Sequence, residues 1–429
     1  MGDDSTRRAP REPRQENDAQ RDQFDLFGNA LPPAAGSKPP RKASDSSNAG
    51  GSSDTSSPSS AAAAHGAYAA DDHATPTLPG FDAPPPPDAP PKKRAHRHGR
   101  RGVAPAEISD DVAAAAQALP PLVRLGTSSW YFPGWKDIVY GDDYAQSKLS
   151  REGLEAYAAH PLLKSVSLDR SFYAPLSVAD YLRYARQVPD DFRFVVKAPA
   201  SVTDALVRGA RGEPAGPNPT FLNAQIATDE FVRPCLEGLG HKVGALVFQF
   251  SPMPDTLLAD PAALIERLAA FLAALPPLPG GSGNAGGPRY AVEIRDASLL
   301  TPRFIRALSA AGVRYCVGLH ARMPDPLRQS AALALLDGEP SGPLLVRWSL
   351  HGGFKYEQAK AKYEPFDRLV DEDPHTRSAL AELAARYALA GQPVIITINN
   401  KAEGSAPLSC IALAKEIAAA YARSQGEAA

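Results

Sequence analysis

The chain has 429 residues and a net charge of −2 at pH 7, and 43% of its residues are hydrophobic. This length is enough for two or three average domains, or for one barrel with appendages. Because neither sign of charge dominates, the composition argues neither for nor against an acidic partner such as nucleic acid.

The sequence also bears on the compartment in which the protein works. No uninterrupted apolar run of about 18 residues occurs, so we expect no membrane span. The chain starts without the apolar stretch of a secretory signal. Its three isolated cysteines, Cys235, Cys316 and Cys410, suit a reducing environment. We therefore expect a cytoplasmic protein.

The first part of the chain, residues 1–118, is rich in Ser, Gly, Pro and Ala. Such a segment buries too little apolar surface to offset the cost of ordering its backbone, about 1–2 kcal/mol per residue. We predict a disordered tail over 1–118, with a short helix at 107–119 beside the folded domain, and one folded domain over 119–425.

The tail contains a short apolar peptide, "DQFDLFGN", at residues 22–29. Its core, "QFDLF", resembles the peptide by which bacterial replication and repair proteins dock on the DNA sliding clamp. The resemblance implies that Leu26 and Phe27 fill an apolar pocket of the clamp and that Gln23 hydrogen-bonds at the rim of this pocket. The alternative is that the peptide forms a short helix that docks on the barrel itself.

A basic arm follows at residues 92–101, "KKRAHRHGRR". A flexible cationic segment next to a folded domain can neutralise phosphates and bind nucleic acid in a salt-sensitive, sequence-independent way. A solubilising linker is the alternative. The six candidate contacts with nucleic acid are Lys92, Lys93, Arg94, Arg97, Arg100 and Arg101.

From residue 122 onward, short apolar runs alternate with segments of helical periodicity. Eight strands alternating with about eight helices predict a parallel (β/α)₈ barrel of the TIM type. An open doubly wound sheet is the alternative, but no G-x-G-x-x-G follows the first strand. The predicted strands are 122–127, 164–169, 192–198, 243–250, 289–294, 314–319, 343–349 and 393–399, and the clearest helical segments are 176–188, 261–275, 301–312 and 376–391.

Two Gly- and Pro-rich segments interrupt the repeat. Residues 208–225 follow the third strand, so we expect a loop or lid over the mouth of the barrel. Residues 276–288 lead into the fifth strand and are therefore expected at the opposite face, as a flexible connector without a role in chemistry.

In a TIM barrel the active site lies where the strands end. Strand alternation turns Lys197 into the lumen together with Val195, and it turns Glu293 and Arg295 away from the helices. We predict Glu293 and Lys197 as catalytic residues, with Glu293 as general acid or base. The predicted substrate-binding residues are Trp130, Asp169, Tyr173, Gln249, Arg295, Arg347, Asn399 and Asn400.

Structural alternatives accompany these roles. Glu293 and its cationic neighbours could form an ion pair that only closes the barrel. The aromatic stretch 128–135 could plug the barrel end instead of stacking on a ligand. His320 and His351 follow strands six and seven, where a lone histidine is commonly part of the hydrogen-bonded structure. Together with Glu293 and Asp169, the two histidines are too few candidate ligands to indicate a metal site. We therefore predict no metal site and no cofactor, although the sequence does not exclude a divalent metal.

The order of seven blocks along the chain resembles the domain-of-unknown-function 72 family. These blocks are "GTSSWYFPGW", "SFYAPLS", "PDDFRFVVKAPASVTD", "LGHKVGALVFQFSP", "YAVEIRD", "LLVRW" and "NNKAEGSAP". The resemblance implies a TIM-type barrel whose biochemical activity is not established. Its likeness to endonuclease IV and xylose isomerase relatives has suggested a DNA-related role, but only by analogy of fold.

The family's recurrent polar positions fall on Trp130, Phe172, Tyr173, Lys197, Gln249, Glu293, Arg347, Asn399, Asn400 and Gly404. Departures from the family pattern occur at Ser167 and Asp169, which replace an acid and an amide, and at Thr203 and Asp204, where the family often has Thr-His. Residues 347–376 also differ from the family's usual shorter block. The geometry of substrate binding is therefore expected to differ from the family norm.

Three functions follow as hypotheses. The first is a DNA-associated barrel, possessing hydrolytic activity on phosphoryl or anionic groups and recruited by the clamp peptide. The second is a barrel enzyme for a small anionic or sugar-like metabolite, with the tail incidental. The third is a non-catalytic protein that binds nucleic acid or another partner.

Overall fold

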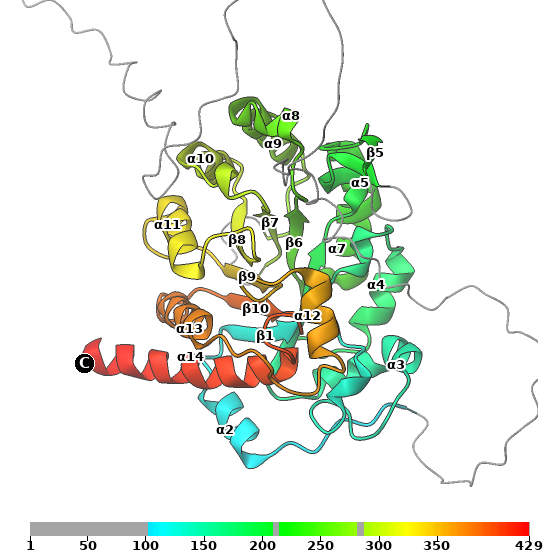
Figure 1. Cartoon of the computed structure of the whole chain (residues 1–429), viewed down its shortest axis with the longest axis vertical. Helices are drawn as coiled ribbons and strands as arrows, with labels where there is room; N and C mark the ends of the chain where they lie inside the picture. The colour runs from blue at the N-terminus through cyan, green and yellow to red at the C-terminus, as the bar shows by residue number, and fades with distance from the viewer. Residues whose placement is uncertain (1–101, 209–213, 281–286, 429) are drawn as a thin grey trace, which may run out of the picture.

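The computed structural model describes residues 102–208, 214–280 and 287–428. Within them, eight parallel strands close into a barrel in the order β1-β10-β9-β8-β7-β6-β3-β2 (Figure 1). The strands are β1 (Val123–Thr127), β2 (Leu163–Leu168), β3 (Arg193–Lys197), β6 (Val243–Gln249), β7 (Arg289–Glu293), β8 (Arg314–Leu319), β9 (Leu344–Trp348) and β10 (Val394–Ile398).

Helices surround the barrel, and α14 lies against α13 and α2 (Figure 1). The longer ones are α2 (Asp110–Ala118), α3 (Gln146–Ala158), α4 (Val178–Ala185), α7 (Arg233–Leu239), α9 (Pro261–Ala273), α10 (Pro302–Ala310), α11 (Pro326–Asp337), α12 (Tyr356–Tyr363), α13 (Pro374–Leu389) and α14 (Ala406–Ala428). Single turns form α5 (Ala200–Thr203), α6 (Ala224–Ala227), α8 (Asp255–Leu258), η1 (Pro133–Trp135), η2 (Arg170–Phe172), η3 (Thr228–Val232), η4 (Gly240–Lys242) and η5 (Ala297–Leu299).

Several helices begin at a side chain that accepts a hydrogen bond from the backbone N–H three residues later. Such a cap satisfies one of the N–H groups that have no partner inside the helix. The capping residues are Ser177 of α4, Asp260 of α9, Thr301 of α10, Asp325 of α11 and Asp373 of α13.

Strand alternation separates two layers of apolar packing. On β3, Phe194 and Val196 pack with the large core under the helices, whereas Val195 belongs to a separate cluster. That separate cluster draws one or two residues from each of six strands, as expected for the packed lumen of a barrel: Val195, Ala245, Val247, Ala291, Cys316, Leu345 and Ile395. The lumen below the mouth is therefore filled, and the polar side chains lie at its carboxyl end.

The predicted (β/α)₈ architecture is confirmed, with all eight strands within one or two residues of their expected bounds. The closed barrel excludes the open sheet. The insertion expected as a loop at 208–225 instead begins with a small antiparallel hairpin of β4 (Leu206–Arg208) and β5 (Pro214–Pro217), followed by α6. In the connector expected at 276–288, residues 281–286 lie outside the described part of the chain.

The folded domain starts earlier than residue 119. The segment 102–118 is bound to the barrel by hydrogen bonds from Ala106 N to Val139 O (3.0 Å) and from Gly141 N to Ala104 O (3.0 Å). On α2, Asp111 pairs with Lys415 of α14. The sequence did not reveal this attachment, because part of it is made by backbone hydrogen bonds, which no side-chain pattern predicts.

The clamp-like peptide at 22–29 and the basic arm at 92–101 lie outside the described residues. In the part of the chain that the structure describes, no helix is both long enough and apolar enough to cross a bilayer. The three cysteines are buried thiols without a disulfide.

Candidate functional site

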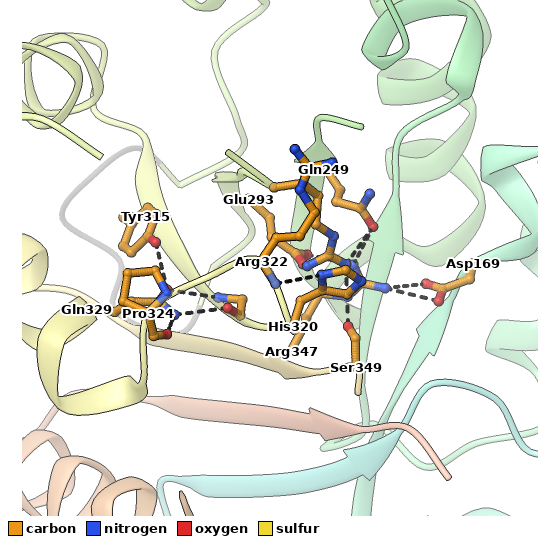
Figure 2. A network of polar contacts seen from close by, with 12 residues as sticks. Asp169, Gln249, Glu293, Tyr315, His320, Arg322, Pro324, Gln329, Arg347 and Ser349 are labelled. Carbon is orange, nitrogen blue, oxygen red and sulfur yellow. Dashed lines mark hydrogen bonds and ion pairs between the residues drawn. The ribbon is translucent and has the colours of Figure 1, made fainter. Parts of the chain in front are cut away.

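Glu293, the last residue of β7, lies between two arginines at the carboxyl end of the barrel (Figure 2). Its Oε1 is 2.5 Å from Nη1 of Arg295, and its Oε2 is 2.6 Å from Nη1 of Arg347. The Glu293 side chain is completely buried. Burial would raise its pKa, but Arg295 and Arg347 outweigh that effect and hold the pKa below its usual value. Glu293 is therefore a permanently charged anchor for both guanidinium groups.

Arg347 of β9 bridges Glu293 to Asp169 across the mouth (Figure 2). Its Nη2 donates to both carboxylate oxygens of Asp169, at 2.8 and 3.0 Å. Ser167 Oγ donates to the same carboxylate at 2.6 Å, and the Asp169 side chain remains 33% exposed. Asp169 is thus the solvent-facing end of the ion-pair network.

Gln249 and Ser349 also contact the two arginines. Oε1 of Gln249 accepts from Nη2 of Arg295 and from Nη1 of Arg347, both at 3.3 Å. Arg295 Nη2 also lies 3.5 Å from Ser349 Oγ. Gln249 and both arginines were predicted from the sequence. Ser349 was not, although it ends the predicted strand 343–349 and shares a strand face with Arg347.

Two further residues that were missed support the network from β8 and α11. A Cβ at Gly318 would lie only 3.0 Å from Cγ and Oε1 of Glu293 and 3.3 Å from Nη1 of Arg295, so the absent side chain makes room for this pair. Gln329 of α11 donates to Gly318 O (2.9 Å) and accepts from Gly318 N (3.3 Å) and Tyr315 Oη (2.7 Å) (Figure 2). It fixes the backbone against which Glu293 packs.

Lys197, the last residue of β3, belongs to the same cluster of charges. Its Nζ lies 3.5 Å from the centre of the Phe172 ring, and among the described residues it makes no hydrogen bond or ion pair. Burial lowers the pKa of Lys197 to about 7, and Arg347 and Arg295 act in the same direction against the opposing effect of Asp169. The residue as a whole is buried, with 9% of its surface exposed.

Three tyrosines surround Asp169 at the rim: Tyr131 after β1, Tyr173 after β2 and Tyr356 of α12. The Asp169 charge contributes to raising the pKa of all three phenols, although burial is the larger cause in each. The pKa of Tyr173 rises to about 12, and 48% of this residue is exposed. The rim therefore offers aromatic faces to a ligand, and one of them, that of Tyr356, was not predicted.

The other predicted substrate-binding residues are differently placed. Trp130 is buried, and its Nε1 donates to Leu149 O at 3.1 Å. Asn400 is also buried; its Oδ1 accepts from Trp135 Nε1 (3.2 Å) and from Ala406 N (2.9 Å). The Oδ1 of Asn400 thus holds the start of α14, whereas its Nδ2 has no hydrogen-bond partner among the described residues. The assignment of Asn400 to substrate stays a prediction. Asn399 is half-buried, and its Oδ1 accepts from Lys401 N at 3.0 Å.

The remaining polar groups near the mouth do not form a metal centre. His351 Nδ1 contacts the neighbouring Gly352 O at 2.8 Å, and His320 lies beside Arg322. Asp296, which was not predicted, accepts from Met253 N (2.8 Å) and pairs with Arg322 (3.0 Å). Among the residues that the structure describes, no group of three or more His, Cys, Asp and Glu side chains is arranged to hold a metal ion.

Fold and site together define a (β/α)₈ barrel with a buried arginine–carboxylate network and a lysine at its carboxyl end. The family described as "Protein of unknown function DUF72" matches residues 124–428, which span the barrel. The chain therefore belongs to the DUF72 family, as the sequence motifs predicted. Among curated proteins, no sequence matches this chain.

Two solved structures of DUF72 family proteins resemble the chain. One, from Thermotoga maritima, is 20% identical; the match covers 68% of this chain and 98% of that one, with a TM-score of 0.46. The other, from Enterococcus faecalis, is 17% identical; the match covers 69% of this chain and 95% of that one, with a TM-score of 0.43. A methyltransferase from Methanosarcina mazei is 11% identical, covering 73% and 97% of the two chains, with a TM-score of 0.38. These likenesses say nothing about the reaction.

Proposed function

We propose that the barrel mouth is the active site of a hydrolase for a small substrate with an anionic, phosphoryl-type group. The observation that carries this proposal is the Lys197 amine, which has a pKa of about 7 and no hydrogen-bonding partner among the described residues. A group with a pKa near the working pH is suited to proton transfer, because both of its forms are populated. Lys197 is thus assigned as the general base.

Glu293 does not suit the acid–base role that we expected from the sequence. Its carboxylate is fully buried and both oxygens are held by arginines. A general base must come within hydrogen-bonding distance of the proton that it removes. We therefore assign Glu293 to positioning Arg295 and Arg347, and proton transfer to Lys197 alone.

The charges at the mouth favour an anionic substrate. Lys197, Arg295 and Arg347 face two carboxylates, Glu293 and Asp169, so the cluster carries one positive charge when the lysine is protonated. An anion bound near Lys197 would raise its pKa, so the amine would become a stronger base in the complex.

An assay of small phosphomonoesters and phosphodiesters with a chromogenic leaving group tests the proposal, with and without added divalent cations. We expect kcat/KM to rise with pH through about 7, because the neutral amine of the free enzyme is the active form. Lys197→Met should reduce the rate by about 10²–10⁴-fold. Lys197→Arg should do the same, because arginine keeps the positive charge but stays protonated.

Lys401→Met is the matched control. Lys401 is also a buried lysine over an aromatic ring, 4.0 Å from the centre of Tyr356, but Lys197 senses no charge from it. The control should keep the wild-type rate. Equal rates for Lys197→Met and wild type, or a rate that Lys197→Arg preserves, would overturn the assignment of the base.

A second candidate function is association with DNA, favoured by the tail sequence. The peptide Gln23, Leu26 and Phe27 resembles a sliding-clamp ligand, and six cationic residues follow at 92–101. Two apolar anchors entering a preformed pocket give useful affinity at a small ordering cost. We propose that the tail recruits the barrel to DNA.

A pull-down with a bacterial sliding clamp tests the peptide. The full chain should be retained, and the Leu26→Ala/Phe27→Ala variant should be lost from the clamp. Phe81→Ala, which removes another large apolar side chain of the same tail, is the control and should bind as the wild type. Retention of the double variant would refute the clamp peptide.

DNA binding itself is measured separately, because the basic arm acts without the clamp. Binding of the full chain to duplex DNA should weaken as salt increases, with a log–log slope of about −0.9 for each phosphate that a cation neutralises. Replacing Lys92, Lys93 and Arg94 by Ala should make this slope shallower. Affinity that is independent of salt would argue against the arm.

A further inference from the structure

A cavity of about 230 Å³ opens beside the ion-pair network, between the start of α3 and the ends of β1 and β2. It reaches the network at Asp169 and Ser167, which both line it, and Lys197 does not line it. Its volume is below the roughly 300–1,000 Å³ of pockets for drug-sized ligands. A small molecule or one moiety of a larger one would fill it.

The cavity walls carry hydroxyl groups and aromatic rings. Five serines contribute, namely Ser128, Ser129, Ser147, Ser150 and Ser167, and Gln146 adds an amide. The aromatic residues are Trp130, Tyr131 and Tyr184, with Trp130 edge-on to both tyrosines. A wall that pairs many hydroxyls with aromatic faces suits a ligand that is hydroxylated on its edges and apolar on its faces, such as a sugar ring.

Two arginines also line the cavity, Arg151 of α3 and Arg170 of η2. The one acid in the lining, Asp169, is already paired with Arg347. Arg151 is exposed and makes no ion pair or hydrogen bond among the described residues. The lining therefore has an excess of positive charge, which favours an anionic group on the ligand.

The first turn of α3 adds backbone hydrogen-bond donors to the positive charge of the cavity lining. The residue before the helix is Ala145, which has no capping side chain, and the first turn carries no acid. Gln146 and Ser147, whose backbone N–H groups have no intrahelical acceptor, line the cavity. An uncapped helix start next to an unpaired arginine is a favourable place for a phosphate.

We infer that this cavity binds a sugar phosphate, either free or as part of a nucleotide. The phosphate lies at the start of α3 with Arg151, and the sugar hydroxyls lie toward Ser167 and Asp169. The inference goes beyond the proposed function, because it places the phosphate at the start of α3 and not at Lys197. The binding event itself does not need Lys197, since that residue is outside the cavity.

Isothermal titration of the full chain tests the inference with four probes: ribose 5-phosphate, adenosine 5′-monophosphate, ribose and inorganic phosphate. Ribose 5-phosphate or the nucleotide should bind at least about tenfold more tightly than ribose or phosphate, because both parts of the cavity are then used. Tighter binding of the nucleotide than of ribose 5-phosphate identifies a nucleotide as the source of the sugar phosphate. The reverse order identifies a free sugar phosphate.

Two variants locate the site. Arg151→Ala should weaken the binding of the phosphorylated probes by about tenfold, because one charge-assisted contact is lost, and should leave the affinity for ribose unchanged. Arg186→Ala, which removes an exposed arginine at the end of α4 and outside the cavity, is the matched control and should bind as the wild type. Ser150→Phe fills the cavity from α3 and should abolish binding of all sugar probes without lowering the melting temperature.

Failure of this inference and failure of the proposed function are distinguishable. Lys197→Met should bind the sugar phosphate as well as the wild type does, even though hydrolysis is lost. Three results would each overturn the inference, whatever the phosphatase assay shows. The Ser150→Phe variant could still bind the sugar probes, or the Arg151→Ala variant could bind the phosphorylated probes as tightly as the wild type. Inorganic phosphate could also bind as tightly as ribose 5-phosphate. The same holds if neither phosphorylated probe binds.

Discussion

Lys197 and Glu293 come from different strands, β3 and β7, and end in one cluster of charges. The two arginines lower the pKa of both, but with opposite consequences. For the carboxylate this fixes the charged form, whereas for the lysine it favours the neutral form. The same neighbours therefore have opposite effects on the charge of the two groups, because one is an acid and the other a base.

The lowered pKa of Lys197 predicts a pH dependence of stability. Below pH 7 the amine is charged in both the folded and the unfolded chain, so the full cost of burying the charge lowers the stability of the fold. This cost disappears as the pH rises from about 7 to 10.5, the pKa of an exposed lysine. Lys197→Met should therefore exceed the wild type in free energy of unfolding at pH 6, with the gap narrowing toward pH 10. Urea denaturation across this range measures the gap.

Lys401 supplies the comparison for that measurement. Burial lowers the pKa of Lys401 to about 8, so Lys401→Met should show the same trend over a narrower interval, from about 8 to 10.5. A gap for Lys197→Met that stays constant with pH would contradict the lowered pKa.

Removing the Glu293 charge should cost stability. Glu293→Gln leaves Arg295 and Arg347 buried with one carboxylate fewer, and breaking a buried ion pair commonly costs about 3–5 kcal/mol. Glu382→Gln removes an exposed carboxylate of α13 that pairs with Arg423 of α14, and should cost less than about 1 kcal/mol. Chemical denaturation compares the two; equal effects would mean that the central network contributes no more than a surface pair.

At the scale of elements, β8 and α11 hold the network without contributing a charge to it. Gly318 of β8 leaves room for Glu293 and Arg295, and Gln329 of α11 bonds both backbone groups of that glycine. A strand and its helix thus act as one support. Such contacts join elements that pack side by side, so they follow from the barrel topology and not from any local motif.

Gly318→Ala tests this support. The new methyl group would lie about 3.0 Å from Glu293 atoms, so the pair must shift, and overpacking of this kind costs about 1–3 kcal/mol. We also expect a loss of activity larger than that of Gly312→Ala, a substitution in the turn before β8 with open space around its Cβ. Gly312 has a φ of +65°, so its variant is strained through the backbone conformation and not by a close contact with Glu293 or Arg295. A Gly318→Ala protein that is as stable and as active as the wild type would refute the close approach.

The whole molecule is a barrel to which the segment 102–118 is attached through backbone hydrogen bonds and α2. This attachment brings α2 against the C-terminal helix α14, so the two ends of the described chain are joined. The folded unit therefore begins well before the first strand of the barrel.

Truncation tests that boundary. A chain starting at residue 102 should melt at the same temperature as the full chain, whereas one starting at residue 119 should melt several degrees lower, because it loses α2 and its contacts with α14. Differential scanning calorimetry separates the two. Equal melting of the shorter chain and the full chain would return the boundary to residue 119.

The sequence was sufficient for the barrel, since eight apolar runs separated by helical segments have few other solutions, and the period of two along a strand placed Lys197 and Glu293 in the lumen. It was not sufficient for the contacts of Asn400, whose Oδ1 accepts hydrogen bonds from Trp135 and from the start of α14. Nor did it supply Tyr356, because no strand pattern places a residue of a separate helix at the rim.

Local alternation and the order of elements are properties of neighbouring residues, so the sequence by itself determined the fold, the family and the face on which the charges lie. The pairing of Glu293 with Arg347, 54 positions away, depends on the register of several strands at once. So does the burial that lowers the pKa of Lys197 and the cavity beside Asp169. Only the tertiary structure decided these, because the energy of a charge depends on its neighbours in space.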